Sequence, residues 1–154
     1  MKSFFRPLIL AGLLMGGAAW AADTGPAREE PGDALLGQAR EAVKRQDWAA
    51  AANMLREAVA VNPGSADTHN LYAYSLRKSA KPDMNLVFKH YNEALRIDPK
   101  HRGAHEYIGE AYLMVGNVAK AKEHLSTLDK LCFFPCGEHA DLKKAIAAHE
   151  AKTK

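Results

Sequence analysis

Residues 58–63 read Ala-Val-Ala-Val-Asn-Pro, and residues 94–99 read Ala-Leu-Arg-Ile-Asp-Pro, so one short pattern recurs 36 residues later. Residues 58–61 and 94–97 are good helix formers or apolar, and the proline that follows two residues later cannot continue a helix. The two segments therefore predict the ends of two equivalent helices. Repeats with a period of roughly 20–50 residues are typical of stacked arrays, so this recurrence decides the fold class.

Two further sets of positions extend the repeat to a third block. The first set consists of small residues: Ala39, Ala73 and Gly109. The second set marks the start of the following helix: Trp48, Met84 and Val118. The spacings are 34 then 36 residues in the first set, and 36 then 34 in the second. Both series agree if two extra residues lie in the proline-containing turn at 79–82, where small residues and proline indicate a break.

Each block predicts two antiparallel helices. Ala51, Leu55 and Ala58 recur at the spacing of one helix face, which predicts a buried stripe. Asp47 and Asp83 stand where a second helix needs an N-cap residue. We expect the small residues of the first set to let the first helix approach the second closely. Because one pair cannot bury its own apolar face, about three pairs must stack into an all-α array.

These patterns resemble the tetratricopeptide repeat family over residues 33–132, in blocks at 33–63, 66–99 and 102–132. Gly109-x-x-Tyr112 and Gly116-Asn117 in the third block match the family pattern, as does the ending at 92–99 in the second. The first block departs from the pattern with two alanines where the family prefers glycine and tyrosine. The resemblance implies a helical solenoid of about three helix pairs plus a C-terminal capping helix within 133–154. It also implies a non-enzymatic scaffold that needs no cofactor.

The family binds partners in a concave groove lined by the first helix of each pair, which implies a set of groove residues here. These are Arg40, Lys44, Asn70, Tyr74, Arg77, Glu106 and Glu110, with Leu36, Val43, Lys78 and Leu113 beside them. The groove would have a basic end and an acidic end. The alternative is that these are ordinary solvated helix residues. If the groove interpretation holds, charge reversal at Arg40 and Arg77 should weaken partner binding and leave melting unchanged.

The N-terminus predicts export. Lys2 and Arg6 precede an apolar run at 8–19, and Ala19-Trp20-Ala21 is the small-x-small pattern that signal peptidase cleaves. We expect a signal peptide at 1–21, a flexible leader at 22–32 and a periplasmic or secreted protein. The run is short for a membrane span, which needs about 20 apolar residues, although a retained anchor is the alternative. We therefore expect no stable membrane span after cleavage, and a protein or peptide partner in the cell envelope.

Charge excludes one class of partner. Removal of Lys2 and Arg6 with the signal peptide leaves 19 basic and 18 acidic residues, a net charge of +1. With no basic excess there is no electrostatic case for a nucleic-acid partner. The chain also lacks a Gly-rich phosphate loop, Gly-x-Ser-x-Gly and His-Glu-x-x-His, so no enzyme is predicted.

The two cysteines lie together where the third block ends. In an oxidising compartment Cys132 and Cys136 are expected to form a disulfide that holds the last helix, about 138–151. Such a small loop would contribute about 2 kcal/mol or less. The alternative is a thiol or metal-handling protein, in which both thiolates and His139 bind copper or zinc.

Histidines offer a second metal hypothesis. His69 and His105 occupy equivalent repeat positions, so we expect them to pack between helices. His101 and His105 stand four residues apart, a spacing that could also chelate a metal on one helix face.

Overall fold

The computed structural model describes residues 30–153, and within this range the chain is all helical. The predicted signal peptide and most of the predicted leader lie outside the described residues. The helices are α1 (Pro31–Lys44), α2 (Trp48–Val61), α3 (Ala66–Arg77), α4 (Met84–Ile97), α5 (Arg102–Met114), α6 (Val118–Leu131) and α7 (Gly137–Lys152). The three blocks predicted from the sequence thus correspond to α1–α2, α3–α4 and α5–α6.

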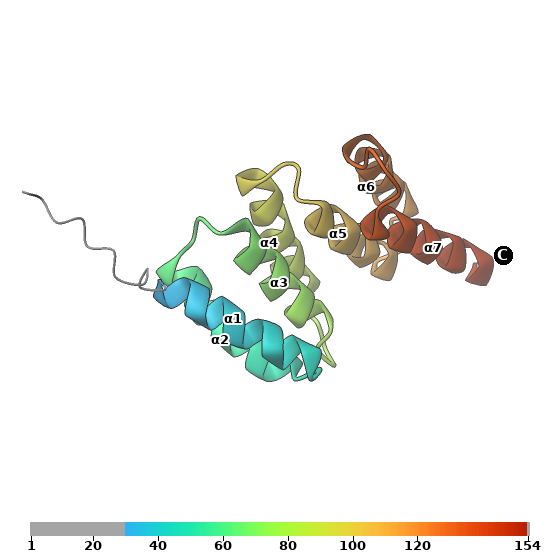
Figure 1. The fold of residues 1–154 in the computed structure, drawn as a ribbon. Coiled ribbons are helices and arrows are strands. Elements are labelled where there is room, and N and C mark those ends of the chain that lie inside the picture. Colours follow the sequence, from blue (N-terminus) through green and yellow to red (C-terminus); the bar gives the residue numbers. More distant parts are fainter. Residues whose placement is uncertain (1–29, 154) are drawn as a thin grey trace, which may run out of the picture.

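The helix pairs stack in chain order into one array (Figure 1). The helices of each pair pack on each other, and the α2–α3 and α4–α5 contacts join successive pairs. The final helix, α7, packs on α5 and α6 and extends the array beyond the third pair (Figure 1). The predicted all-α helical repeat solenoid is confirmed.

The starts of the second helices follow the predicted capping. Asp47 Oδ1 accepts a hydrogen bond from the Ala50 N–H at 3.0 Å, and Asp83 Oδ1 accepts from the Leu86 N–H at 3.3 Å. Asn117 caps α6 in the same way, accepting from the Lys120 N–H at 3.1 Å. A side-chain acceptor at this position satisfies a backbone N–H that has no partner within its helix.

The turns inside the pairs differ in length. The α1–α2 turn spans residues 45–47 and the α5–α6 turn spans 115–117, whereas the α3–α4 turn spans 78–83. The two short turns each place one residue in the left-handed region, Gln46 at φ 60° and Gly116 at φ 74°. Glycine adopts this conformation without steric cost, whereas a glutamine in it costs the fold roughly 1 kcal/mol of conformational free energy. The longer second turn holds the insertion that the spacings predict.

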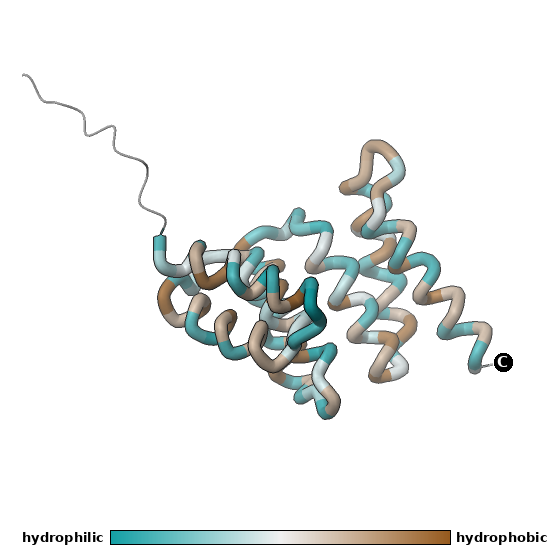
Figure 2. Tube along the Cα trace, turned by 60° about the horizontal axis from the view of Figure 1, so that its bottom comes forward, coloured by the Kyte–Doolittle hydropathy of each residue, from teal (hydrophilic) through white to brown (hydrophobic). Residues whose placement is uncertain are grey.

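The core is divided into clusters along the array. One joins the first pair to α3 around Leu55, one joins the second and third pairs around Tyr91 and Ile108, and one joins the third pair to α7 around Leu128 and Leu142. All five side chains are fully buried. Hydrophobic and hydrophilic residues are interspersed along the tube in Figure 2, as expected for helices that bury one stripe.

Two expectations about the fold are wrong in detail. Gly109 does not serve the approach of α5 to α6: a Cβ atom there would lie 2.6 Å from Leu142 Cδ2, so the glycine makes room for α7. The leader does not extend through residue 32, because α1 begins at Pro31. Proline is favoured in a first helical turn, where its missing N–H would have no helical partner.

Candidate binding groove

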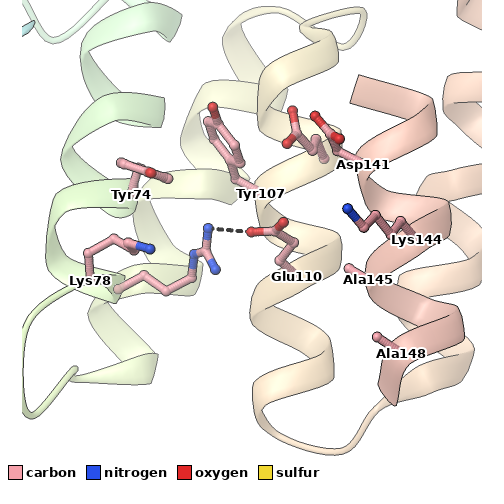
Figure 3. A pocket seen from close by; sticks show the side chains of 10 residues that line it. Tyr74, Lys78, Tyr107, Glu110, Asp141, Lys144, Ala145 and Ala148 are labelled. Atoms are coloured by element: carbon pink, nitrogen blue, oxygen red, sulfur yellow. Dashed lines mark hydrogen bonds and ion pairs between the residues drawn. The ribbon is translucent and has the colours of Figure 1, made fainter. Parts of the chain in front are cut away.

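The open face of α3, α5 and α7 forms a pocket of about 450 Å³ (Figure 3). Its lining residues come from all three helices: Tyr74, Arg77 and Lys78 of α3, Glu106, Tyr107 and Glu110 of α5, and Asp141, Lys144, Ala145 and Ala148 of α7. The helix α7 therefore occupies the place of a fourth first helix and forms one wall. Tyr107 and the α7 residues were not among the predicted groove residues. The spacing of 141, 144, 145 and 148 on one helix face is the signal that could have indicated them.

Arg77 is the central charge of this pocket, and it is buried. Its Nη2 lies 2.6 Å from Glu110 Oε2, and its Nε donates to the Tyr91 hydroxyl at 3.3 Å. The predicted basic and acidic ends of the groove therefore meet and neutralise each other at this pair. Since removal of one partner leaves a buried charge unpaired, the structure favours a loss of stability on charge reversal at Arg77 over the unchanged melting expected from the sequence.

Aromatic rings line the groove beside Arg77. The Tyr74 and Tyr107 ring centroids lie 4.7 Å apart, and Trp48 contacts Tyr74 edge-on at 5.8 Å. The Arg77 guanidinium lies over Tyr74 and Tyr107, at 5.4 and 5.8 Å from their centroids. The Lys78 ammonium lies 5.6 Å from the Trp48 centroid. Such rings offer large contact area with little conformational entropy to lose, which suits a binding surface.

Glu106 lies at the α7 side of the pocket and is 8% exposed. It makes no hydrogen bond or ion pair with the rest of residues 30–153. Burial raises the pKa of its carboxyl to about 7, and the negative charges of Glu110, Asp141 and Glu138 add to the effect. A second carboxylate, Asp141, lines the same pocket (Figure 3) and is close enough to Glu106 for its charge to raise the Glu106 pKa. This end therefore holds a buried acid without a compensating cation.

The other predicted groove residues lie toward the N-terminal end. Arg40 Nη2 forms an exposed ion pair with Asp67 at 2.7 Å, and His101 Nε2 lies 3.0 Å from the other oxygen of Asp67. A second open pocket of about 490 Å³ lies there between α1 and α3. Lys44 pairs with Glu41 of its own helix at 2.6 Å and lies outside both pockets. Lys44 is therefore an ordinary solvated helix residue, which is the alternative given above for the predicted groove residues.

Asn70 is buried, and it does not line either pocket. Its Nδ2 would lie 3.4 Å from a Cβ atom on Gly103, so the amide packs between α3 and α5. Its Oδ1 has no hydrogen-bond partner within the described residues. The structure thus brings Tyr74, Arg77, Glu106 and Glu110 together and leaves Arg40, Lys44 and Asn70 apart from them.

The comparison with known families agrees with this geometry. A model of the tetratricopeptide repeat matches residues 36–81, which cover most of α1 and all of α2 and α3. Solved tetratricopeptide domains superpose on most of the chain. Residues 36–81 thus match the tetratricopeptide repeat family, and residues 30–153 have the helical repeat fold of its solved members.

The individual proteins that resemble this chain are distant from it in sequence. An inactive TPR repeat-containing thioredoxin, TTL3 of Arabidopsis thaliana, is 28% identical over 84% of the chain, and the match spans 17% of the relative's length. The type III secretion translocator chaperone SycD of Yersinia enterocolitica superposes with a TM-score of 0.70 at 14% identity, over 82% of this chain and 97% of SycD. The first TPR domain of RPAP3, solved with an HSP90 peptide, superposes with a TM-score of 0.66 at 14% identity. The superposition covers 79% of this chain and 94% of the RPAP3 domain.

The matched family is a protein-interaction family rather than a catalytic one. Within residues 30–153, no helix is long and apolar enough to cross a membrane.

The histidines of the second and third repeats form two equivalent pairs. His69 Nδ1 lies 2.9 Å from His90 Nδ1, and His105 Nδ1 lies 2.9 Å from His124 Nδ1. Because the Pro63 carbonyl can only accept, His69 donates to it from Nε2, and a neutral His69 then accepts at Nδ1 from His90.

In each histidine pair the two Nδ1 atoms share one proton, so protonation of both rings would place two N–H groups against each other. Burial and the neighbouring His69 lower the pKa of His90 to about 4, and burial and His105 do the same for His124. His101 instead caps α5, accepting from the Ala104 N–H, and His105 Nδ1 faces His124, so the structure favours packing over the chelating alternative for this pair.

Cys132 and Cys136 form a disulfide between α6 and α7, with Cα atoms 5.9 Å apart. Sulfurs bonded to each other are not thiolates, which are the form that binds metals. His139 lies 3.7 Å from Asp129, and among residues 30–153 no group of three or more His, Cys, Asp and Glu could hold a metal ion. The metal-handling alternative therefore has no support in the described chain. The loop exposes the Phe133 and Phe134 side chains to solvent.

Proposed function

We propose that this helical repeat protein is an exported adaptor that holds an extended segment of a partner protein in the groove of α3, α5 and α7. The observation that carries the proposal is the pocket itself, an open recess of about 450 Å³ with paired tyrosine rings and an uncompensated acid. A rigid helical scaffold with such a recess is suited to recognition, because few interface side chains need to be ordered on binding.

Peptide binding on this fold has precedents among the similar structures. SycD was also solved with a peptide of the translocator YopD, and that structure superposes with a TM-score of 0.67 over 82% of this chain. These proteins share only the fold with this chain, at 13–14% identity. They support peptide recognition as the mode of binding, whereas the partner here must be recognised by the residues described above.

The cell envelope is the proposed location. It is supported by the basic start, the apolar run at 8–19 and the Ala19-Trp20-Ala21 pattern of the N-terminus. The Cys132–Cys136 disulfide is also in keeping with an oxidising compartment such as the periplasm. Cell fractionation and mass spectrometry of the N-terminus test this part, and an uncleaved cytosolic chain would contradict it.

Site-directed photo-crosslinking in cells tests the groove. A photoreactive residue at Lys78, on the rim of the groove, should capture a defined partner protein. The matched control is Lys89, an exposed lysine on α4 that does not line the pocket. Capture of the same species from Lys89 alone, or from both positions with equal yield, would contradict groove binding.

A further inference from the structure

We propose that the groove recognises a basic side chain of the bound segment, a lysine or arginine whose cationic group lies between the carboxylates of Glu106 and Asp141. This inference rests on the proposed peptide-binding function and specifies the chemistry of the peptide. It starts from Glu106, which is more than nine-tenths buried, lines the pocket and has no partner among residues 30–153.

Two of the acids near Glu106 already form ion pairs with arginines. Glu110 pairs with Arg77, and Glu138 lies 3.5 Å from Arg102. Asp141 lines the same pocket as Glu106, is exposed, and forms no ion pair within the described chain. Glu106 and Asp141 are thus the two carboxylates of this end that a ligand could use.

The cations of the pocket do not neutralise them. The Arg77 guanidinium is held by Glu110 and Tyr91, and the Lys78 ammonium lies over the Trp48 and Tyr74 rings. Lys144 is exposed on α7 and lies within 4.0 Å of no carboxylate in the described residues. Because a buried carboxylate without a cation is costly, a cation brought by a partner would relieve that cost and gain a charge-assisted hydrogen bond.

The same arrangement disfavours an acidic segment at this end. A carboxylate entering between Glu106 and Asp141 would add like charge to a site that already raises the pKa of Glu106. A long basic side chain also has an aliphatic stem, which can pack on the half-buried Tyr107 ring while its charge reaches Glu106. A basic side chain therefore matches both the charge and the apolar wall.

Nuclear magnetic resonance titration at pH 8 tests the proposal with three acetylated and amidated pentapeptides. Their central residue is lysine, norleucine or glutamate, and alanine fills the other positions. The lysine peptide should bind about tenfold or more tightly than the norleucine peptide and shift the side-chain carbons of Glu106 and Asp141. Glu106→Gln should abolish the preference, whereas Glu57→Gln, at an exposed glutamate of α2, should keep it.

Three results would overturn the basic-residue site. These are equal binding of the lysine and norleucine peptides, a lysine preference that survives in Glu106→Gln, and no binding of the lysine peptide at millimolar concentration. If any of these occurs while crosslinking from Lys78 still captures a partner, the charge specificity is wrong and groove binding stands. If the capture comes from Lys89 instead, the proposed function itself is wrong.

Discussion

Arg77 on α3 and Glu110 on α5 form an ion pair of 2.6 Å across the boundary between the second and third repeats. Arg77 also donates to Tyr91 on α4, so one side chain joins three helices. The pair holds the α3 and α5 walls of the groove at a fixed separation and cancels the charge at its centre. The carboxylates of Glu106 and Asp141, at the end of the groove beside α7, remain without a cation as partner.

Replacement of Arg77 by alanine should destabilise the protein. The change leaves the Glu110 charge and the Tyr91 hydroxyl without their partner, so we expect the free energy of unfolding to fall by about 2–4 kcal/mol. Urea denaturation measures this value. The control is Arg40→Ala, which breaks an exposed pair and should cost at most about 1 kcal/mol. Equal losses in the two variants would show that the Arg77–Glu110 pair is not structural.

A large residue at Gly109 should disturb the docking of α7. Gly109→Leu places side-chain atoms where Leu142 lies, so we expect a loss of about 1–3 kcal/mol in thermal or urea unfolding. Gly37→Leu is the matched control, because nothing lies within 4 Å of a Cβ atom at that helical position. It should stabilise the protein slightly, since leucine is a better helix former. Adding Leu142→Ala should recover part of the loss, and no recovery would contradict the assigned contact.

The histidine pairs should make the fold sensitive to acid. His90 and His124 take up a proton near pH 6.5 when unfolded but only near pH 4 when folded, so the unfolded chain binds more protons between these values. Stability therefore falls as the pH is lowered through this window. We expect about 1–2 kcal/mol per histidine after allowance for solvent screening. Melting curves of the His90→Gln and His124→Gln double variant should depend less on pH, and an unchanged slope would contradict this origin.

Glu106 should have the opposite effect on the pH dependence of stability from the histidines. Its carboxyl holds a proton up to about pH 7 when folded but loses it near pH 4.5 when unfolded, so its contribution lowers stability as the pH rises through this range. Glu106→Gln should therefore raise the melting temperature at pH 8 and change it little at pH 4.5. A binding residue whose removal stabilises the free protein is expected where function requires an uncompensated charge. Lower stability of the variant at pH 8 would contradict the account.

Local sequence rules predicted the repeat framework well. The three helix pairs, the position of the longer second turn and the capping by Asp47 and Asp83 all follow from residues close together in the sequence. These features depend on helical periodicity, turn chemistry and side-chain-to-backbone hydrogen bonds within a few residues.

The groove was predicted only in outline, because its chemistry depends on contacts between distant helices. The Arg77–Glu110 pair spans 33 residues, and periodicity alone does not show that two groove charges face each other. Gly109 was assigned to the approach of α6, although it faces Leu142 of α7. The position of α7 was the missing information, since it adds Asp141 and Lys144 to the pocket that Glu106 lines.

The central claim is that the tyrosine-lined groove binds the partner, and the affinity of two paired-ring variants tests it most directly. Tyr74 and Tyr107 form one ring pair, and Phe88 and Tyr112 form another with the same centroid distance of 4.7 Å outside the pocket. Calorimetry with the partner captured at Lys78 should show about a tenfold or greater loss of affinity when Tyr74 and Tyr107 are both replaced by alanine. Replacement of Phe88 and Tyr112 should leave affinity nearly unchanged as long as the variant stays folded. Equal affinity of the groove variant and the native protein would contradict the claim.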